Sequence, residues 1–160
     1  MTKPPASTTY SSFVARDSVR LGFMLAALHD VDILAADVGN AYLNAPCREK
    51  VYCIAGPEFG SDEGRTAIII RALYGLKSSR AACRAHLAQS MNDIGFTPSK
   101  GDPDVWMRPA TKPNGYKYYE YVLIYVDDIL CISHQAEKVM ETLGSLYRIK
   151  KDSKSGKSLC

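Results

Sequence analysis

The sequence predicts an α+β fold in which helices pack on one face of an antiparallel sheet. Three observations support this class. Short β-rich runs follow one another along the chain, two of them are separated by only two acidic residues, and helical apolar spacing appears near the start, the middle and the end. The length of 160 residues corresponds to one domain with a sizeable core.

The first half of the chain alternates helix and strand signals after a loose lead-in at residues 1–12, which is rich in Pro, Ser and Thr. Asp17 and Ser18 are suited to cap the first helix. The expected elements of this half are a helix to about Leu28, strands at residues 33–38, 51–54 and 66–73, a helical turn at 41–43, and a loop at 56–65.

The second half repeats the pattern of one helix followed by strands. Ser78 or Ser79 is suited to cap its first helix, and Gly95 to end it. The expected elements are a helix to about residue 94, strands at 104–108, 116–126 and 129–133, a Pro/Gly-rich loop at 109–115, a helix at 135–149, and a basic flexible tail at 150–160.

Composition excludes several classes of protein. The hydrophobic fraction of 46% is that of a globular chain, and a net charge of +3 gives no strong basic field. The five cysteines are scattered and form no C-x-x-C pair, which favours reduced thiols over a disulfide framework or zinc ribbon. No signal peptide is visible, and charges interrupt the most apolar stretch, so we expect no membrane span.

Two adjacent acids stand out between two strongly apolar strands. Asp127 and Asp128 are expected at the tip of a tight hairpin, where two close anions repel unless a cation neutralises them. A hard divalent cation with oxygen ligands is the natural partner. The alternative is that the pair forms only a solvated turn, since Asp is common in turns.

A third acid has a similar setting at the end of a predicted buried strand. Asp37 is followed closely by Gly39, which lets backbone and ligand approach. If its strand neighbours the hairpin, Asp37 and Asp127 converge and can hold two Mg²⁺ ions roughly 3.5–4 Å apart, with Mn²⁺ as the alternative ion. On its own, Asp37 is equally consistent with capping the next turn.

Five strings occur in a characteristic order along the chain: VARDSVR at residues 14–20, DVGNAY at 37–42, ALYGLKSS at 72–79, GDPDVW at 101–106 and YVDD at 125–128. Their order and spacing resemble those of the reverse transcriptases of copia-type long-terminal-repeat retrotransposons. The resemblance runs from about residue 10 to residue 149. It implies a polymerase palm-like fold over residues 13–149, with fingers and thumb incomplete.

The family resemblance implies roles at the acidic motifs. Asp37 and Asp127 would be the principal catalytic metal ligands, Asp128 the second acid of the hairpin, and Val38 a backbone carbonyl ligand. Tyr42 would be a steric gate whose ring excludes a ribose 2′-OH. The alternative for Tyr42 is a buried aromatic with a packing role.

The family resemblance also implies binding roles outside the acidic motifs. Tyr74 and Gly75 would line the nucleotide pocket. Lys77 and Ser79 would contact nucleic acid at the start of a helix, and Tyr125 would pack near the primer terminus. An exposed lysine and an ordinary strand tyrosine are the alternatives for Lys77 and Tyr125.

One stretch departs from the family pattern. Where the family has QSPRAW, residues 78–83 are SSRAAC, so Arg80 stands at the proline position, Ala81 at the arginine position and Cys83 at the tryptophan position. A family-like basic segment expected before residue 10 and a thumb expected after residue 149 are not seen either.

The implied activity is RNA-directed DNA polymerisation, in which a primer 3′-OH attacks a deoxynucleotide. The implied partners are a primed RNA or DNA template, deoxynucleoside triphosphates and the remaining polyprotein regions, in cytoplasmic virus-like particles. The alternatives are a non-catalytic remnant of a decayed element and an RNA-binding module of the split βαβ kind, which would display aromatics rather than acids on its sheet.

Overall fold

The computed structural model describes residues 13–151, which divide into two compact units. The first unit comprises Tyr42–His86, and the second comprises residues 13–41 together with residues 87–151. The expected lead-in at residues 1–12 and most of the expected tail, residues 152–160, lie outside the described residues.

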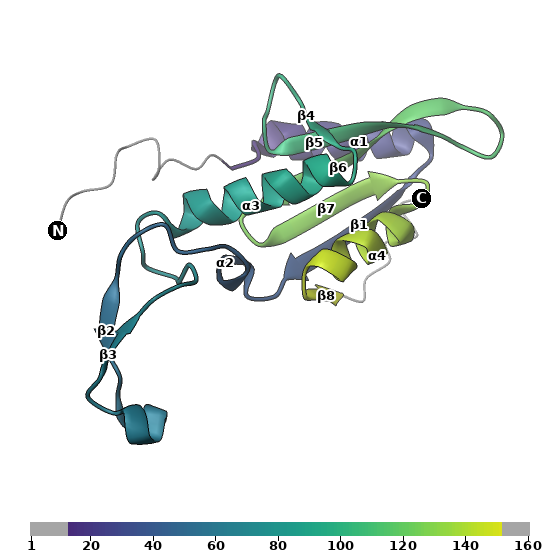
Figure 1. Ribbon diagram of the computed structural model, residues 1–160. Helices are drawn as coiled ribbons and strands as arrows, with labels where there is room; N and C mark the ends of the chain where they lie inside the picture. Colours follow the sequence, from purple (N-terminus) through teal and green to yellow (C-terminus); the bar gives the residue numbers. More distant parts are fainter. Residues whose placement is uncertain (1–12, 152–160) are drawn as a thin grey trace. The chain divides into compact units, whose positions relative to one another are not determined.

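The second unit is built on a six-stranded sheet in which every neighbouring pair is antiparallel, in the order β4-β5-β6-β7-β1-β8 (Figure 1). This confirms the α+β class with an antiparallel, palm-like sheet. The strands are β1 (Asp32–Val38), β4 (Thr97–Pro98), β5 (Val105–Thr111), β6 (Lys117–Tyr125), β7 (Asp128–Ser133) and β8 (Ile149–Lys151).

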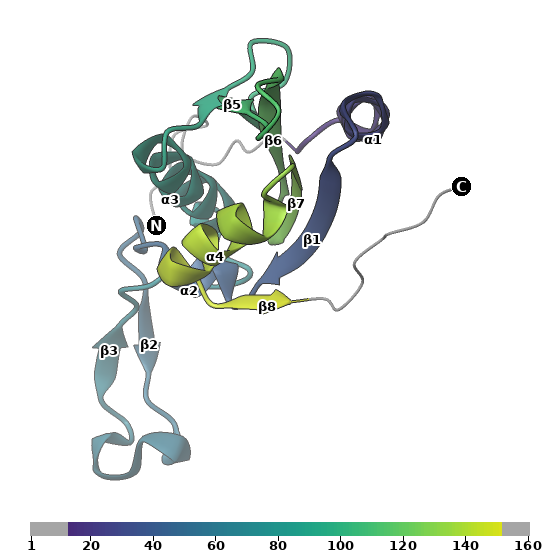
Figure 2. The same ribbon diagram turned by 90° about the vertical axis from the view of Figure 1, so that its right-hand side faces the viewer.

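Helices cover both faces of this sheet, whereas we expected them on one face. On one face, Leu123 and Ile132 form a buried cluster with Ala26 of α1 (Arg16–His29). Alternate residues point to the other face, where Val122 and Ile129 are buried and α4 (Ala136–Leu146) packs on β7 and β1 (Figure 2). Both faces of the central strands are apolar, and each therefore needs a cover.

The start of α1 is held differently from the expected cap. Its N-cap is Ala15, and no side chain caps it locally. Asp102, which is distant in the sequence, caps the helix instead. Its Oδ2 accepts hydrogen bonds from the Ala15 N–H (2.9 Å) and from the Ser18 hydroxyl (2.6 Å). A negative charge at a helix N-terminus is favourable, so Asp102 stabilises α1 from a distant loop.

Two strands have different lengths from those expected. The strand expected at residues 66–73 ends earlier, as β3 (Thr66–Ile68), because the following residues form a hydrogen-bonded loop. β5 continues through Pro109, which we had placed in a loop. β4 pairs only with Met107 and Trp106, so at Pro109 β5 is an edge strand, where proline is tolerated.

The helix expected at residues 135–149 ends at Leu146, and a strand follows where the end of that helix and the start of a flexible tail were expected. Residues 149–151 form β8 and pair with the end of β1, which places Ile149 opposite Val38 in register. The alternating apolar signal of such a short basic strand is too weak to detect in the sequence. None of the helices among the described residues has the length and hydropathy of a membrane span.

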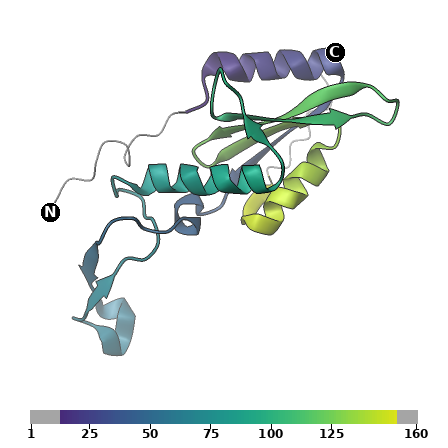
Figure 3. The same cartoon turned by 45° about the horizontal axis from the view of Figure 1, so that its top comes forward.

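The first unit contains a small hairpin and the beginning of a long helix. β2 (Tyr52–Ile54) pairs with β3, and a 3₁₀ segment (Pro57–Asp62) lies between them where a loop was expected. α2 (Ala41–Asn44) leads into this unit. α3 (Ser79–Asp93) begins in it and runs as one continuous helix into the second unit (Figure 3).

Candidate functional site

The three acids singled out in the sequence lie on neighbouring strands of the second unit. In the β1–β7 pair, Asp37 is directly opposite Asp128. The N–H of Val38 donates a 2.7 Å hydrogen bond to the carbonyl oxygen of Asp127. The strand end that carries Asp37 is therefore joined to the hairpin tip by backbone hydrogen bonding.

Register extends this arrangement into a row across the sheet. Tyr125 of β6 is opposite Asp128, which is opposite Asp37, and Lys150 of β8 follows as the backbone partner of Asp37. Directly opposite residues in antiparallel strands share a face, so the Tyr125, Asp128 and Asp37 side chains lie on the face that α1 covers. Asp128 is exposed, whereas Asp37 and Asp127 are half-buried.

Tyr125 has an aromatic neighbour that the sequence did not indicate. The ring of Phe13 lies with its centroid 5.1 Å from that of Tyr125, at an interplanar angle of 36°. Tyr125 is nevertheless half exposed. Its ring is therefore supported on one side, and its predicted contact with a primer terminus stays a prediction.

The hairpin turn is displaced by one residue from the expected position and is strained. The two turn residues are Val126 and Asp127, because Tyr125 already pairs with Asp128. Val126 has φ +59°, in the left-handed region that a β-branched residue rarely adopts. Such strain costs on the order of 1–3 kcal/mol and is concentrated at functional sites.

The carboxylates of Asp37, Asp127 and Asp128 are suited to bind a hard divalent cation, because carboxylate and carbonyl oxygens are the ligands that Mg²⁺ prefers. However, within residues 13–151 no three His, Cys, Asp or Glu side chains are gathered closely enough to hold a metal ion. The register of Asp37 and Asp128 thus provides one carboxylate pair, and the two-ion arrangement expected from the sequence stays a prediction.

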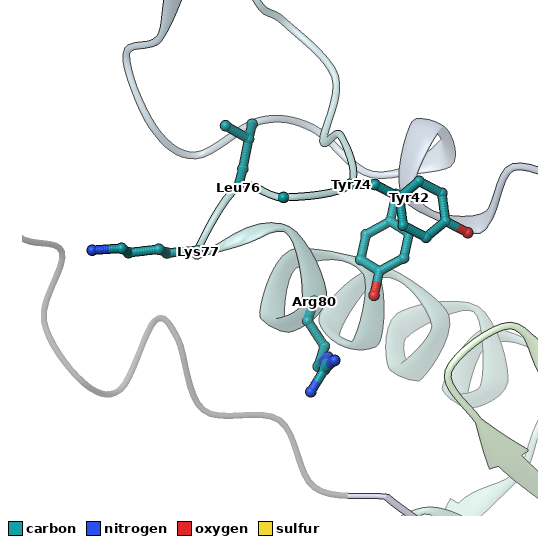
Figure 4. Close-up of a pocket in the computed structure, with 6 residues that line it drawn as sticks. Tyr42, Tyr74, Leu76, Lys77 and Arg80 are labelled. Carbon is teal, nitrogen blue, oxygen red and sulfur yellow. The ribbon is translucent and has the colours of Figure 1, made fainter.

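A second group of predicted residues forms a pocket in the first unit (Figure 4). Its cavity of about 320 Å³ is lined by Tyr42, Tyr74, Gly75, Leu76, Lys77 and Arg80. The rings of Tyr42 and Tyr74 are 4.3 Å apart between centroids and tilted by 59°. Tyr42 is only 6% exposed, whereas Tyr74 is 67% exposed, so the inner ring supports an outer ring that faces solvent.

Hydrogen bonds fix the loop that leads to this pocket. The N–H of Leu73 donates to the Ser79 hydroxyl at 3.1 Å, and the N–H of Ala72 donates to the Ala45 carbonyl. Gly75 has φ +91°, which only glycine adopts without strain. The Ser79 side chain is 2% exposed and is engaged in holding this loop, so its predicted contact with nucleic acid stays a prediction.

Glu49 anchors the other end of the same loop. Its Oε1 accepts a hydrogen bond from the Ser78 N–H at 2.8 Å. Hydrogen bonds from Ser78 lower the pKa of Glu49, and the positive charge of Lys77 contributes in the same direction. Lys77 thus has a negative charge close by within its own unit.

The sequence did not single out Phe13 or Glu49, it included Asp102 only as part of the GDPDVW motif, and it mentioned Arg80 only as a departure from the family pattern. Phe13, Glu49 and Asp102 act over long separations, and nothing in a local pattern reveals their partners. Arg80 had a detectable signal, because a cation replaces the expected proline in the segment that follows the Tyr74 motif.

Comparisons with known proteins agree with the resemblance seen in the motifs. A family model described as reverse transcriptase (RNA-dependent DNA polymerase) matches residues 6–154. The chain is 30% identical over 141 residues to the Retrovirus-related Pol polyprotein from transposon RE1 of Arabidopsis thaliana, and 28% identical over 141 residues to that from transposon RE2. It is 26% identical over 119 residues to a putative transposon Ty5-1 protein of Saccharomyces cerevisiae.

The matches differ in how much of each relative they cover. They include 86% of this chain for both Arabidopsis proteins, but only 9% of each of those polyproteins, and 71% of this chain with 37% of the yeast protein. The chain thus spans about a tenth of the length of the Arabidopsis relatives. No solved structure matches the chain significantly.

Proposed function

The chain belongs to the reverse transcriptase family, and from that premise we propose that it forms the palm part of an RNA-directed DNA polymerase of a retrotransposon polyprotein. The observation that carries the proposal is the register of Asp37 opposite Asp128, with Val38 hydrogen-bonded to Asp127. Neighbouring strands therefore bring together the acids of two motifs that are about ninety residues apart in the sequence.

The acids would hold the divalent ions that this family generally uses. Asp37, Asp127 and the Val38 carbonyl are the proposed ligands, with Asp128 as the supporting acid. When bound, the ions would lower the pKa of the primer hydroxyl and stabilise charge on the phosphate. The strained turn at Val126 holds the carboxylates on a rigid hairpin, which suits a site whose geometry must be set before the substrate arrives.

The first unit would bind the incoming deoxynucleotide. Tyr42, whose ring lies against that of Tyr74, would be the steric gate that excludes a ribose 2′-OH. We further propose that a primed template and the other polyprotein regions complete the binding channel, and that the enzyme works in cytoplasmic particles.

Primer extension on an RNA template tests the proposed function. The 160-residue chain and a longer polyprotein product containing it are each assayed with Mg²⁺ and deoxynucleotides. Asp127→Asn is expected to lower extension by about a hundredfold or more, because a neutral amide holds a divalent cation weakly. Asp93→Asn, an exposed acid on α3, is the matched control and should leave extension unchanged.

Extension that survives Asp127→Asn would refute the catalytic assignment. A non-catalytic remnant is the second candidate, and the observation that favours it is the lack of a three-ligand metal group within the described residues. That candidate predicts no Mg²⁺-dependent extension from the longer product either. The RNA-binding alternative predicts instead RNA binding that chelators do not change.

A further inference from the structure

The pocket of the first unit combines two aromatic rings in contact with positive charge. Two of its six lining residues, Lys77 and Arg80, are cations, and none of the six is acidic. A cavity of about 320 Å³ lies at the small end of the range for pockets that bind small molecules. Its chemistry therefore fits a ligand with a flat ring at one end and negative charge at the other.

The two cations differ in the direction in which their side chains extend. The positive charge of Lys77 is one of the influences that lower the pKa of Glu49. Figure 4 also shows that the Lys77 side chain extends away from the two tyrosine rings, whereas Arg80 leaves the first turn of α3 on the side of the rings. Arg80 is thus better placed than Lys77 to meet a ligand held by the tyrosines.

Arginine also has the better geometry for a phosphate group. Its planar guanidinium donates two parallel hydrogen bonds to two oxygens of one phosphate, whereas lysine offers a single point charge. The loop that precedes Arg80 is fixed by the Leu73–Ser79 and Ser78–Glu49 hydrogen bonds. A ligand that binds here therefore pays little to order the backbone.

We propose that Arg80 is the phosphate-binding residue of this pocket and donates to a phosphate group of a nucleoside triphosphate whose ring system lies against Tyr74. This inference rests on the proposed function, since it specifies how the nucleotide of that reaction is held. It assigns a role to the position at which the chain departs from its family pattern.

Calorimetric titration of the full chain with dATP in EDTA tests the proposal, because the chelator removes any contribution of metal bound by the acids. Arg80→Ala should weaken dATP binding by at least about tenfold, the loss expected for a charge-assisted hydrogen bond. Arg80→Lys should lose less. Deoxyadenosine, which has no phosphate, should bind all variants equally.

Two further variants act as matched controls. Arg48→Ala removes an exposed arginine of the same unit outside the pocket, and should leave dATP binding unchanged. Lys77→Ala should cost less than Arg80→Ala. The proposal is overturned if the unmodified chain binds no dATP, if Arg80→Ala binds dATP normally or also loses deoxyadenosine, or if Lys77→Ala costs as much as Arg80→Ala.

These outcomes are independent of primer extension. Binding of dATP that depends on Arg80, combined with extension that survives Asp127→Asn, would refute the proposed catalytic assignment and keep the role of Arg80. Normal dATP binding by Arg80→Ala, combined with loss of extension in Asp127→Asn, would do the reverse.

Discussion

Val126 shows how a single residue can bear strain at the turn that carries the acids. Its φ of +59° is set by the two-residue connection between β6 and β7, since Tyr125 pairs directly with Asp128. Short hairpin loops favour turns with positive φ, which glycine and asparagine adopt easily and valine does not. The acids next to Val126 are thus held by a turn that requires a positive φ at a valine, a residue that disfavours this conformation.

Replacing Val126 by glycine should therefore stabilise the protein. Relief of on the order of 1–3 kcal/mol of strain exceeds the entropy cost of a glycine, about 0.5–1 kcal/mol, so we expect the free energy of unfolding to rise by about 1 kcal/mol. Urea denaturation followed by the fluorescence of Trp106, the single tryptophan, measures it.

Val31→Gly is the matched control for this prediction. Val31 is also half-buried in the second unit, but it lacks a positive φ and packs against the α1 cluster. Its replacement should lower stability by about 1–2 kcal/mol. Equal losses from the two substitutions would show that the Val126 turn carries no strain.

At the scale of elements, α1 approaches the sheet closely at one residue. Gly22 faces Ile132 and Leu123, and a Cβ built on it would lie 2.8 Å from Ile132 Cδ1. Gly144 on α4 has no neighbour within 4 Å of such a Cβ. The two helical glycines thus differ in the space around them while sharing the same local backbone preference.

The same substitution at both positions separates packing from helix propensity. Gly22→Val should lower the free energy of unfolding by about 1–3 kcal/mol, because the added methyl groups crowd Ile132. Gly144→Val should change it by less than about 0.5 kcal/mol. Urea unfolding monitored by circular dichroism measures both, and similar changes would contradict the close approach of α1.

Most elements were predictable from the sequence because they carry strong local periodicity. The first helix, the β1 strand, the β6–β7 hairpin and the Gly95 terminus of α3 are all found near the expected places. β4 and β8 were missed, since strands of two and three residues have too few side chains to show alternation. The turn lies one residue earlier than expected, because the pair of acids suggested a turn at Asp127 and Asp128, whereas the pairing of Tyr125 with Asp128 places it at Val126 and Asp127.

The positions of some candidate residues were predictable. The structure places Asp37 at the end of a strand and the acid pair at a hairpin, as expected, and it brings Tyr42 and Tyr74 together in one pocket. Their roles in binding and catalysis stay predictions. Long-range partners such as Asp102 and Glu49 were not predictable, because a single carboxylate in a loop resembles any other until the fold brings its partner near.

At the scale of the whole molecule, the candidate residues divide between the two units. Asp37, Asp127 and Asp128 belong to the second unit, and the tyrosine pocket with Arg80 belongs to the first. The modest net charge of +3 is consistent with a chain that supplies acids as well as cations. The first unit can thus be tested by nucleotide binding and the second by its dependence on divalent ions. The second unit also contains a buried titratable thiol, Cys131, through which its stability can be tested.

Stability at high pH should depend on Cys131, a fully buried residue of β7, which lies between β6 and β1 in the sheet. Burial raises the pKa of its thiol to about 12 from an ordinary value of 9.0, and the charge of Glu120 adds to the effect. The folded chain keeps the proton that the unfolded chain loses, so this contribution is complete below pH 9 and is lost as the pH rises towards 12.

The expected slope is up to about 1.4 kcal/mol of unfolding free energy per pH unit. Urea unfolding of the unmodified chain and of Cys131→Ala, followed through Trp106 between pH 7 and 11, measures it. The variant should be less stable at pH 7, because it leaves a cavity, but its stability should fall less steeply above pH 9. The difference between the two slopes isolates Cys131, because burial also raises the pKa of Tyr121 in both proteins. Parallel slopes would show that the thiol ionises without unfolding the sheet.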